Sequence, residues 1–275
     1  MKFTKMQGIG NDFVMVDTIQ DGDLPADLPG FSRSVTDRRL GVGGDGLILI
    51  ERGDAAPFRM RMFNPDGSEA EMCGNGIRCF GRLLKEHGHI TTDHADIETG
   101  GGILDLQLID EVRIRVDVGL ARLTRGDVGM TGDPDQMFID QPVGGAFFGT
   151  AVLMGNPHLV IFVPDVAQVD LPRVGPIFEH HPFFPNRVNV HFVEVVDKTH
   201  LIQRTWERGA GITLACGTGA CSCGVAAFLT GRAERSVEIQ LPGGKLEIEY
   251  LESGHVLMTG AAETVFEGEI DVQAV

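Results

Sequence analysis

The chain of 275 residues is poor in several features that mark whole classes of protein. It carries 23 lysines and arginines against 39 aspartates and glutamates, which gives a formal net charge of −16. A chain this acidic repels phosphate backbones and anionic lipid, so the balance argues against nucleic-acid and membrane partners. One tryptophan and one tyrosine also leave few stacking surfaces for bases.

Long hydrophobic runs are missing as well, because no apolar stretch approaches the ~18 residues of a spanning helix. The segment Met1-Lys2-Phe3-Thr4-Lys5 lacks the apolar core of a secretory signal. Five cysteines are too few, and too unevenly spread, for a secreted disulfide framework. We therefore expect a chain that works in a reducing cytoplasm. Whether it acts alone or as a homodimer is left open.

Short alternating apolar segments dominate what is present, and they predict strands. The predicted strands are Phe13–Asp17, Leu47–Glu51, Phe58–Phe63, Ile103–Leu108, Val112–Val118, His158–Val163, Val188–Val196, Leu201–Trp206, Val237–Leu241, Leu246–Leu251 and His255–Met258. Two helices are predicted, from about Gly74 to His87 and from about Gly217 to Thr230, each followed by a glycine as a stop signal. Many strands with one central helix per half indicate an α+β fold of mainly antiparallel sheets.

One internal repeat stands out at the starts of the two predicted helices. The first reads Cys73-Gly74-Asn75-Gly76 and the second Cys216-Gly217-Thr218-Gly219, about half a chain length apart. Both place Cys-Gly-x-Gly at the mouth of a helix. The simplest account is a duplicated half, which gives two pseudosymmetric α/β lobes with one such cysteine each.

A cysteine at a helix mouth has chemical consequences. Unpaired backbone N–H groups and the positive end of the helix stabilise a thiolate, so we expect a pKa lowered toward neutrality. The glycines allow a ligand to approach the backbone, and the N–H groups suit a carboxylate. Two such mouths across a cleft would place one sulfur on each face of a carbon atom. One thiolate could then remove a proton while the opposite thiol returns one.

Other readings of the cysteines compete with this one. Cys79, Cys221 and Cys223 fall inside the predicted helices and read as small buried packing residues. A zinc site built on Cys216, Cys221 and Cys223 lacks a Cys-x2-Cys knuckle and a fourth ligand, so we expect no metal. A nucleophilic pair of a cysteine with His158 would indicate a hydrolase instead.

Two glycine-rich motifs are weaker signals. Gly41-Val42-Gly43-Gly44-Asp45-Gly46 is not followed by the Gly-Lys-Ser/Thr of a phosphate loop, and Gly8-Ile9-Gly10-Asn11-Asp12-Phe13 precedes a strand rather than a helix. The chain has five lysines, and none lies in a motif that indicates a Schiff base. No cofactor is expected.

Taken together, these motifs resemble the diaminopimelate epimerases. The resemblance is carried by Lys5–Phe13, Gly41–Gly46, Phe63–Arg78, Gly155-Asn156-Pro157-His158, Asn186–Asn189, Trp206-Glu207-Arg208-Gly209 and Ala215–Gly219. The motifs run in family order from residue 5 to about residue 230 and together are highly specific.

The resemblance implies an isomerase that interconverts LL- and meso-2,6-diaminopimelate without a cofactor, on the route to lysine and peptidoglycan. It also implies two α/β lobes, each a curled, mainly antiparallel sheet around a central helix. The expected N-terminal lobe comprises residues 1–118 and 264–275 and carries Cys73. The expected C-terminal lobe comprises residues 119–263 and carries Cys216.

The resemblance also assigns roles to residues. Cys73 and Cys216 would be the acid/base pair, while backbone N–H groups of Gly74, Asn75, Gly217 and Thr218 would bind the carboxylate at the reacting carbon. The distal amino-acid head of the substrate would contact Asn64, Asn156, Asn189 and Arg208, with Glu207 near its amine. Asn11 and His158 would orient the carboxylate and tune the thiols, although a simple turn role for Asn156 and a hydrogen-bonding role for His158 stay open.

Some departures and rivals remain. Gly46 stands where some members of the family carry glutamine, so a side-chain contact from that position is lost. Proline and hydroxyproline racemases are similar around both cysteines but typically have histidine at the position of Asn75. A histidine racemase on the same scaffold is a closer rival, whereas phenazine-type isomerases share the fold without the paired cysteines. A dithiol redox protein would need a Cys-x2-Cys pair.

Overall fold

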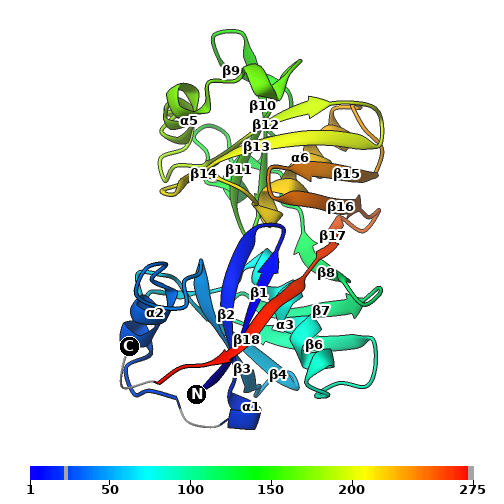
Figure 1. Ribbon diagram of the computed structural model, residues 1–275. Helices are drawn as coiled ribbons and strands as arrows, with labels where there is room; N and C mark the ends of the chain where they lie inside the picture. The colour runs from blue at the N-terminus through cyan, green and yellow to red at the C-terminus, as the bar shows by residue number, and fades with distance from the viewer. Residues whose placement is uncertain (22–23, 272–275) are drawn as a thin grey trace. The chain divides into compact units, whose positions relative to one another are not determined.

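The chain folds into two compact units, shown in Figure 1. This computed structural model describes residues 1–21 and 24–271. One unit comprises Met1–Val116 and Gly260–Val275, and the other comprises Asp117–Thr259. The chain passes between the units within strands β8 (Arg113–Leu120) and β17 (His255–Ala261). Among the residues described, no helix is both long enough and apolar enough to cross a membrane.

Among its described residues, the first unit contains most of the N-terminal strands and three helices. Its strands, besides part of β8 and the end of β17, are β1 (Lys2–Gly8), β2 (Asn11–Asp17), β3 (Gly46–Arg52), β4 (Phe58–Phe63), β5 (Glu69–Ala70), β6 (His94–Thr99), β7 (Gly102–Leu108) and β18 (Glu263–Glu269), and its helices are α1 (Thr18–Asp21), α2 (Leu28–Thr36) and α3 (Gly74–Glu86). Strand β2 runs parallel to β3, and β4 runs parallel to β6. The pairs β1–β2, β3–β4 and β6–β7 are antiparallel.

The second unit has a matching set. Its strands, besides parts of β8 and β17, are β9 (Gln141–Gly144), β10 (Phe147–Met154), β11 (Asn156–Phe162), β12 (Asn189–Val195), β13 (His200–Glu207), β14 (Gly211–Thr213), β15 (Ser236–Leu241) and β16 (Gly244–Tyr250), and its helices are α4 (Arg125–Val128), the 3-10 turn Val166–Gln168, α5 (Leu171–Glu179) and α6 (Gly217–Leu229). Here β11 runs parallel to β12, and β13 runs parallel to β15. The pairs β10–β11, β12–β13 and β15–β16 are antiparallel.

The two units therefore repeat one topology. The hairpin (β1–β2 or β10–β11) is followed by a helix (α2 or α5), by a strand parallel to the second hairpin strand (β3 or β12) and by an antiparallel partner of that strand (β4 or β13). Next come a short strand (β5 or β14), a long helix (α3 or α6) and a strand parallel to β4 or β13 (β6 or β15). Strand β18 pairs with β1, and β9 pairs with β10, so the first strand after each crossing adds to the hairpin of a unit. This shared order confirms the duplication predicted from the two cysteine motifs.

A long helix forms the centre of each unit. Helix α3 packs against β1, β2 and β7, and α6 packs against β10, β11 and β16. Consecutive buried residues run from Asn75 to Gly81 in α3 and from Gly219 to Ala227 in α6, so each helix is enclosed on all sides over these turns. The predicted α+β fold with a sheet around one central helix per half is confirmed. Cys79, Cys221 and Cys223 are fully buried within these helices, as predicted.

Every predicted strand lies on a strand of the structure, and the two predicted helices end one residue early, at Glu86 and Leu229. Helices α2 and α5 were not predicted. Both have a proline in the first turn, where the missing N–H has no intrahelical partner to lose. Helix α5 also has Pro176 in its interior, which in the sequence indicates a break. Strands β1, β6, β10 and β18 were missed too, along with shorter elements.

A cluster of charges holds the glycine-rich loop that leads into β3. Lys5 forms an ion pair with Asp12 at 2.6 Å and also donates to the carbonyl oxygen of Gly43. Arg38 bridges Asp12 at 2.6 Å and Asp45 at 2.7 Å. Burial alone raises the pKa of Asp12, but hydrogen bonds from Arg38 and Lys5 outweigh it and lower the pKa to about 2. These ion pairs thus hold the start of β2 close to the start of β3.

This cluster predicts acid-sensitive stability. Because the pKa of Asp12 is lower in the folded chain than the ordinary 3.8, its stabilising effect is complete above pH 4 or so and is lost as the pH falls toward about 2. We expect Asp12→Asn to lower the free energy of unfolding at neutral pH by about 1 kcal/mol, allowing for partial solvent screening. The difference from the parent chain should shrink across that acid range in urea denaturation.

Glu238→Gln is the matched control, since Glu238 pairs with an exposed Lys245 on the surface. Such a pair contributes a few tenths of a kcal/mol. An Asp12→Asn loss no greater than that of the control, or one that stays constant down to the lowest pH at which the chain is folded, would contradict the assigned role of Asp12.

Candidate active site

The two cysteines of the repeated motif occupy equivalent positions in the backbone. Cys73 precedes α3 with φ −138° and ψ 117°, and Cys216 precedes α6 with φ −126° and ψ 102°. The first intrahelical hydrogen bonds run from Ile77 N to Cys73 O and from Ala220 N to Cys216 O, both at 2.9 Å. The N–H groups of the three residues after each cysteine therefore lie outside the intrahelical ladder. Each helix start offers a positive, anion-binding end beside a thiol.

The second glycine of each motif is required by close packing. A Cβ atom at Gly76 would lie 2.6 Å from Ile48 Cδ1. At Gly219 it would lie 2.2 Å from His191 Cε1 and 2.9 Å from Cys216 Sγ. Any side chain at these positions would push the helix start away from the strand beneath it. The motif thus brings the first helical turn down onto β3 in one unit and onto β12 in the other.

In the first unit, Asn11 links the thiol to the helix start. Cys73 Sγ lies 3.7 Å from Asn11 Oδ1, and Asn75 Nδ2 donates to the same oxygen at 3.2 Å. Asn11 Nδ2 donates to Asp45 Oδ2 at 2.6 Å, so the amide is held with its oxygen toward Cys73. The structure therefore brings Asn11, Cys73 and Asn75 together, with Gly74 supplying the first helical N–H.

A residue to which the sequence assigned no role, Arg78, lies directly beneath this group. Its side chain is 0% exposed, and it donates to Asn75 Oδ1 at 3.0 Å and to Gly74 O at 2.9 Å. The guanidinium thus fixes Asn75 and adds positive charge near the helix start. The available signal was an arginine on the buried face of a predicted core helix, where an unpaired charge is costly.

Asn64 lies apart from these contacts, in the turn that follows β4. Its amide nitrogen Nδ2 donates to Ser68 Oγ at 3.0 Å, and its backbone N–H donates to Ser68 O at 2.8 Å. Gly46, the first residue of β3, leaves no room for a longer side chain, because a Cβ atom there would lie 2.9 Å from Met62 Cε and 3.0 Å from Phe63 O. A glutamine at that position would need its neighbours to shift.

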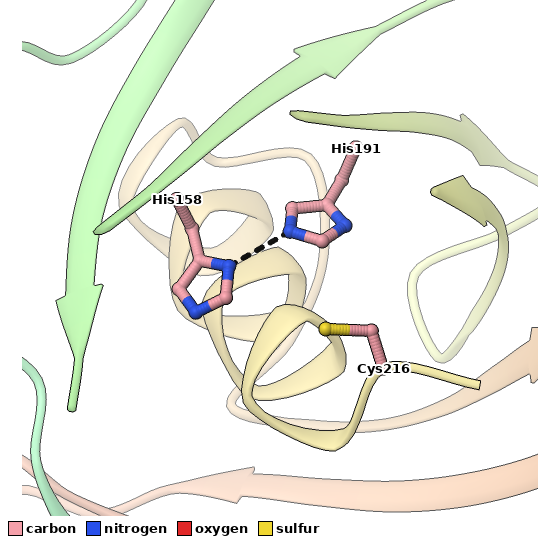
Figure 2. A group of neighbouring side chains, drawn as sticks. All are labelled: His158, His191 and Cys216. Carbon is pink, nitrogen blue, oxygen red and sulfur yellow. Dashed lines mark hydrogen bonds between the residues drawn. The ribbon is translucent and has the colours of Figure 1, made fainter. Parts of the chain in front are cut away.

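In the second unit, a chain of buried polar groups lies beside the Cys216 thiol, and Figure 2 shows its central members, His158 and His191. His158 Nε2 lies 2.7 Å from Asn156 Oδ1, and His158 Nδ1 lies 2.8 Å from His191 Nε2. His191 Nδ1 lies 2.9 Å from Thr205 Oγ1. Gln203 Nε2 donates to Thr205 Oγ1 at 2.9 Å and to His191 Nδ1 at 3.2 Å.

These partners fix the direction of the hydrogen bonds. Asn156 Oδ1 only accepts, so His158 Nε2 carries its hydrogen and His158 Nδ1 is an acceptor. His191 must then donate from Nε2, which leaves His191 Nδ1 to accept from Gln203 and Thr205. Asn156 is held with its oxygen inward and its Nδ2 group directed away from His158. The sequence predicted Asn156 and His158 but missed His191, Thr205 and Gln203.

The remaining predicted residues of this unit surround the end of β13. Asn189 Nδ2 donates to Pro157 O at 3.0 Å, and Asn189 Oδ1 accepts the backbone N–H of Arg208 at 2.9 Å. The Arg208 guanidinium donates to Asn186 O at 3.2 Å. Glu207 Oε1 accepts from Thr213 Oγ1 at 2.5 Å. Asn189 thereby fixes the backbone from which the exposed Arg208 side chain extends.

The start of α6 brings the last predicted residues to the thiol. Cys216 is 5% exposed, and Thr218 Oγ1 lies 3.9 Å from its Sγ. Gly217 is buried at the first position of the helix. The Glu207 carboxyl also lies close enough to the Cys216 thiol for each group to shift the pKa of the other. The structure thus groups Glu207, Cys216, Gly217 and Thr218 at one helix mouth.

Burial sets the protonation of this second group. It raises the pKa of the Cys216 thiol well above its ordinary value, with a contribution from the Glu207 charge, although the Gly219 N–H acts in the opposite direction. Burial also raises the pKa of Glu207 and lowers that of His191 to about 3. The expectation that a helix mouth lowers the thiol pKa is therefore wrong for Cys216 in this structure, because burial outweighs the helix.

Two groups in the described residues bring three potential metal ligands together: His158, His191 and Cys216, and separately Asp17, His87 and His89. In the second group, Asp17 Oδ2 lies 2.7 Å from His87 Nδ1 and 2.6 Å from His89 Nε2, while Asp17 Oδ1 accepts the N–H of Ile19. Hydrogen bonds therefore already account for both oxygens of Asp17, and the group ties β2 to the end of α3.

Solved structures with similar folds come from several enzyme families. A phenazine biosynthesis protein of the PhzF family from Bacillus anthracis superimposes with a TM-score of 0.71 at 18% identity, over 98% of both chains. A hydroxyproline epimerase from Agrobacterium vitis superimposes with a TM-score of 0.66 at 14% identity, over 98% of this chain and 90% of that one. At these identities, the similarity is one of fold.

The sequence itself is similar to a narrower set of proteins. A diaminopimelate epimerase from Moorella thermoacetica is 48% identical over 277 residues, covering 98% of this chain and 99% of the relative. One from Synechococcus elongatus is 47% identical over 279 residues, covering 100% and 99%. The diaminopimelate epimerase family model matches residues 3–124 and 150–265. The chain belongs to the diaminopimelate epimerase family.

Proposed function

We propose that this protein is an isomerase that interconverts LL- and meso-2,6-diaminopimelate without a cofactor, in lysine and peptidoglycan precursor biosynthesis. Membership of the family supports the substrate and the reaction. The observation that carries the mechanism is the pair of cysteines at equivalent helix starts, Cys73 before α3 and Cys216 before α6. We propose these two as the acid/base pair.

The proposed reaction moves one proton at one carbon atom. A thiolate takes the α-hydrogen as a proton and becomes a thiol, while the other cysteine gives its S–H proton to the opposite face and becomes a thiolate. The helix starts bind the adjacent carboxylate through N–H groups of Gly74, Asn75, Gly217 and Thr218. Their positive ends offset the negative charge that develops as the proton leaves. Asn11 and His158 orient the reacting end of the substrate.

The distal amino-acid head of the substrate is proposed to bind Asn64, Asn156, Asn189 and Arg208, with Glu207 near its amine. The guanidinium of Arg208 suits the second carboxylate because its fork can donate two parallel hydrogen bonds. Asn156 supports this role, since its bond to His158 leaves Nδ2 available as a donor. A site of this kind rejects shorter amino acids, which leave its polar groups unpaired.

The reaction needs both thiols reduced, and we therefore propose a reducing cytoplasm as the working compartment. The net charge of −16 makes a nucleic-acid partner unfavourable. The proposed partner is the small-molecule substrate, diaminopimelate.

The direct test is proton NMR of the reduced protein in D2O with LL-diaminopimelate. Because the proton that returns comes from a thiol that has exchanged with solvent, we expect deuterium at the α-position together with the meso isomer. Histidine and proline in parallel samples should remain unlabelled, since neither has a second amino-acid head. Labelling of histidine or proline in place of diaminopimelate would remove the distal-site assignment and keep the two-thiol chemistry.

Each catalytic cysteine should be essential. We expect Cys73→Ala and Cys216→Ala each to lower turnover by at least about a thousandfold, because each removes one of the two proton carriers. Cys79→Ala is the matched control in helix α3. Cys79 is fully buried inside helix α3 and does not lie at the helix start, so its thiol takes no part and folded control protein should retain its activity. Near-normal turnover in either catalytic variant would refute the two-base mechanism.

Arg208 should act through geometry as well as charge. We expect Arg208→Lys to raise the apparent KM about tenfold or more, with a smaller change in kcat, because lysine keeps the charge but loses the two-pronged fork. Arg173→Lys, an exposed position in helix α5, is the matched control and should leave both constants unchanged. Steady-state kinetics with LL-diaminopimelate measure both. Equal KM values in the two variants would remove Arg208 from the distal site.

A further inference from the structure

The side chains of His158, His191 and Cys216, at the start of helix α6, have the composition of a metal site. The ligand atoms of His158, His191 and Cys216 lie within 4.8 Å of one another, and Figure 2 shows the two imidazoles and the thiol converging. The side chains are nearly or fully buried, with Cys216 5% exposed and both histidines 0%. One thiolate and two imidazoles form a ligand set that zinc prefers, with the fourth position left to water or another ligand.

The surroundings of the two imidazoles match those of metal ligands. His158 Nδ1 and His191 Nε2 face each other at 2.8 Å. The outer nitrogens already have partners, Asn156 Oδ1 for His158 and Thr205 Oγ1 for His191. Imidazoles that bind metals characteristically use one nitrogen for the metal and the other for such an oxygen. The inner nitrogens are therefore the available ligand atoms, and between them they hold one hydrogen.

The other unit provides an internal comparison. At the corresponding place, a Cβ atom built on Gly76 would lie 2.6 Å from Ile48, 3.5 Å from Cys73 itself and 3.6 Å from Phe13, so both strand residues that it meets are apolar. The register makes Phe13 and Ile48 the counterparts of His158 and His191, because Phe13 faces Gly46 and His158 faces Asn189 across equivalent parallel pairs. Apolar side chains on the strands are thus enough to accommodate a thiol at a helix start. The histidine pair gives Cys216 two neighbouring metal-ligand atoms, and the described residues under Gly76 give Cys73 none.

We propose that His158 Nδ1, His191 Nε2 and Cys216 Sγ bind a thiophilic divalent cation, with Zn²⁺ as the natural candidate, and that the bound ion blocks the proposed reaction by occupying the Cys216 thiolate. The blocking half of this proposal rests on the proposed function, whereas the binding half does not. Bonds of about 2.0–2.3 Å to zinc place neighbouring ligand atoms more than 3 Å apart. The two imidazoles must therefore separate slightly from their present 2.8 Å contact.

Proton balance gives the proposal a measurable signature. In the free protein, Cys216 is a thiol and His191 carries its hydrogen on Nε2. On binding, the thiol loses its proton to solvent, and the His191 hydrogen moves to Nδ1, which leaves both inner nitrogens as ligands. Gln203 Oε1, which is buried and has no hydrogen-bond partner among the described residues, can then turn toward Thr205 or His191 and accept. The net change is one proton released for each ion bound.

Isothermal titration of the reduced, metal-free protein with ZnCl₂, in chelator-free buffers of different ionisation enthalpy, measures both the stoichiometry and the proton release. We expect one ion and one proton per chain. Cys216→Ala and His191→Gln should each weaken binding at least about a hundredfold, at or beyond the loss typical of an outer-shell partner. Cys73→Ala is the matched control: it lacks the proposed activity but should bind zinc as tightly as the parent chain.

A spectroscopic measurement covers the case in which His191→Gln fails to fold. Co²⁺ bound to a thiolate shows a sulfur-to-cobalt charge-transfer band, which should appear in the parent chain and in Cys73→Ala but vanish in Cys216→Ala. Absence of binding by all chains would overturn the site. Equal loss of binding in Cys73→Ala and Cys216→Ala would also overturn it, because it would indicate an ion held by the two cysteines.

Activity measurements with and without zinc distinguish the metal-site proposal from the proposed function. In the parent chain, zinc should inhibit epimerisation with a midpoint equal to the measured dissociation constant, and excess EDTA should restore full turnover. Zinc binding with the expected variant pattern, in a protein that epimerises none of the tested amino acids, would refute the proposed function and keep the metal site. Epimerisation that is unaffected by saturating zinc would refute the block.

Discussion

The start of a buried helix beneath each cysteine is the constraint on which the rest of this structure depends. Three backbone N–H groups there have no intrahelical acceptor, and enclosing them without a partner would be costly. A thiolate or a bound carboxylate is the partner that such a helix end favours. The second glycine of each motif follows from this arrangement, since Gly76 and Gly219 let the helix start rest on the strand below. Sheet, helix and thiol are therefore one packing unit, built twice.

The two copies differ most where the helix meets the strand beneath it. Under the start of α3 the strand residues are apolar, and the polar contacts near Cys73 come from Asn11 and Asn75, with the buried Arg78 bonded to Asn75. Under α6 the contacts are the His158–His191 pair, backed by Thr205 and Gln203. One fold thus presents one thiol over hydrocarbon and another over neutral imidazoles. Such asymmetry suits a reaction that treats the two faces of a carbon atom differently.

Local sequence signals predicted the central helices, most strands and the members of the two helix mouths, because each of these depends on neighbours within a few residues. His191 was missed because it lies inside an otherwise apolar strand. Its partner His158 is 33 positions away and is reached only through the parallel pairing of β11 with β12. A zinc site built on Cys216, Cys221 and Cys223 was rejected from the spacing of these cysteines, and that spacing gave no sign of the two histidines. Cys221 and Cys223 follow Cys216 along α6 and are buried in the core, whereas both histidines that converge on its thiol come from strands.

The protonation of Cys216 shows how burial and helix compete. The helix start favours a thiolate, yet burial and the neighbouring Glu207 favour the thiol more strongly. When this thiol gives up its proton, the new charge must be stabilised by nearby groups. Burial lowers the pKa of both His158 and His191, so neither imidazole supplies positive charge. The backbone N–H groups of α6 and the hydroxyl of Thr218 remain as donors. A divalent ion would supply directly the charge that this buried thiolate lacks, so the same group of side chains is chemically suited to bind a metal ion.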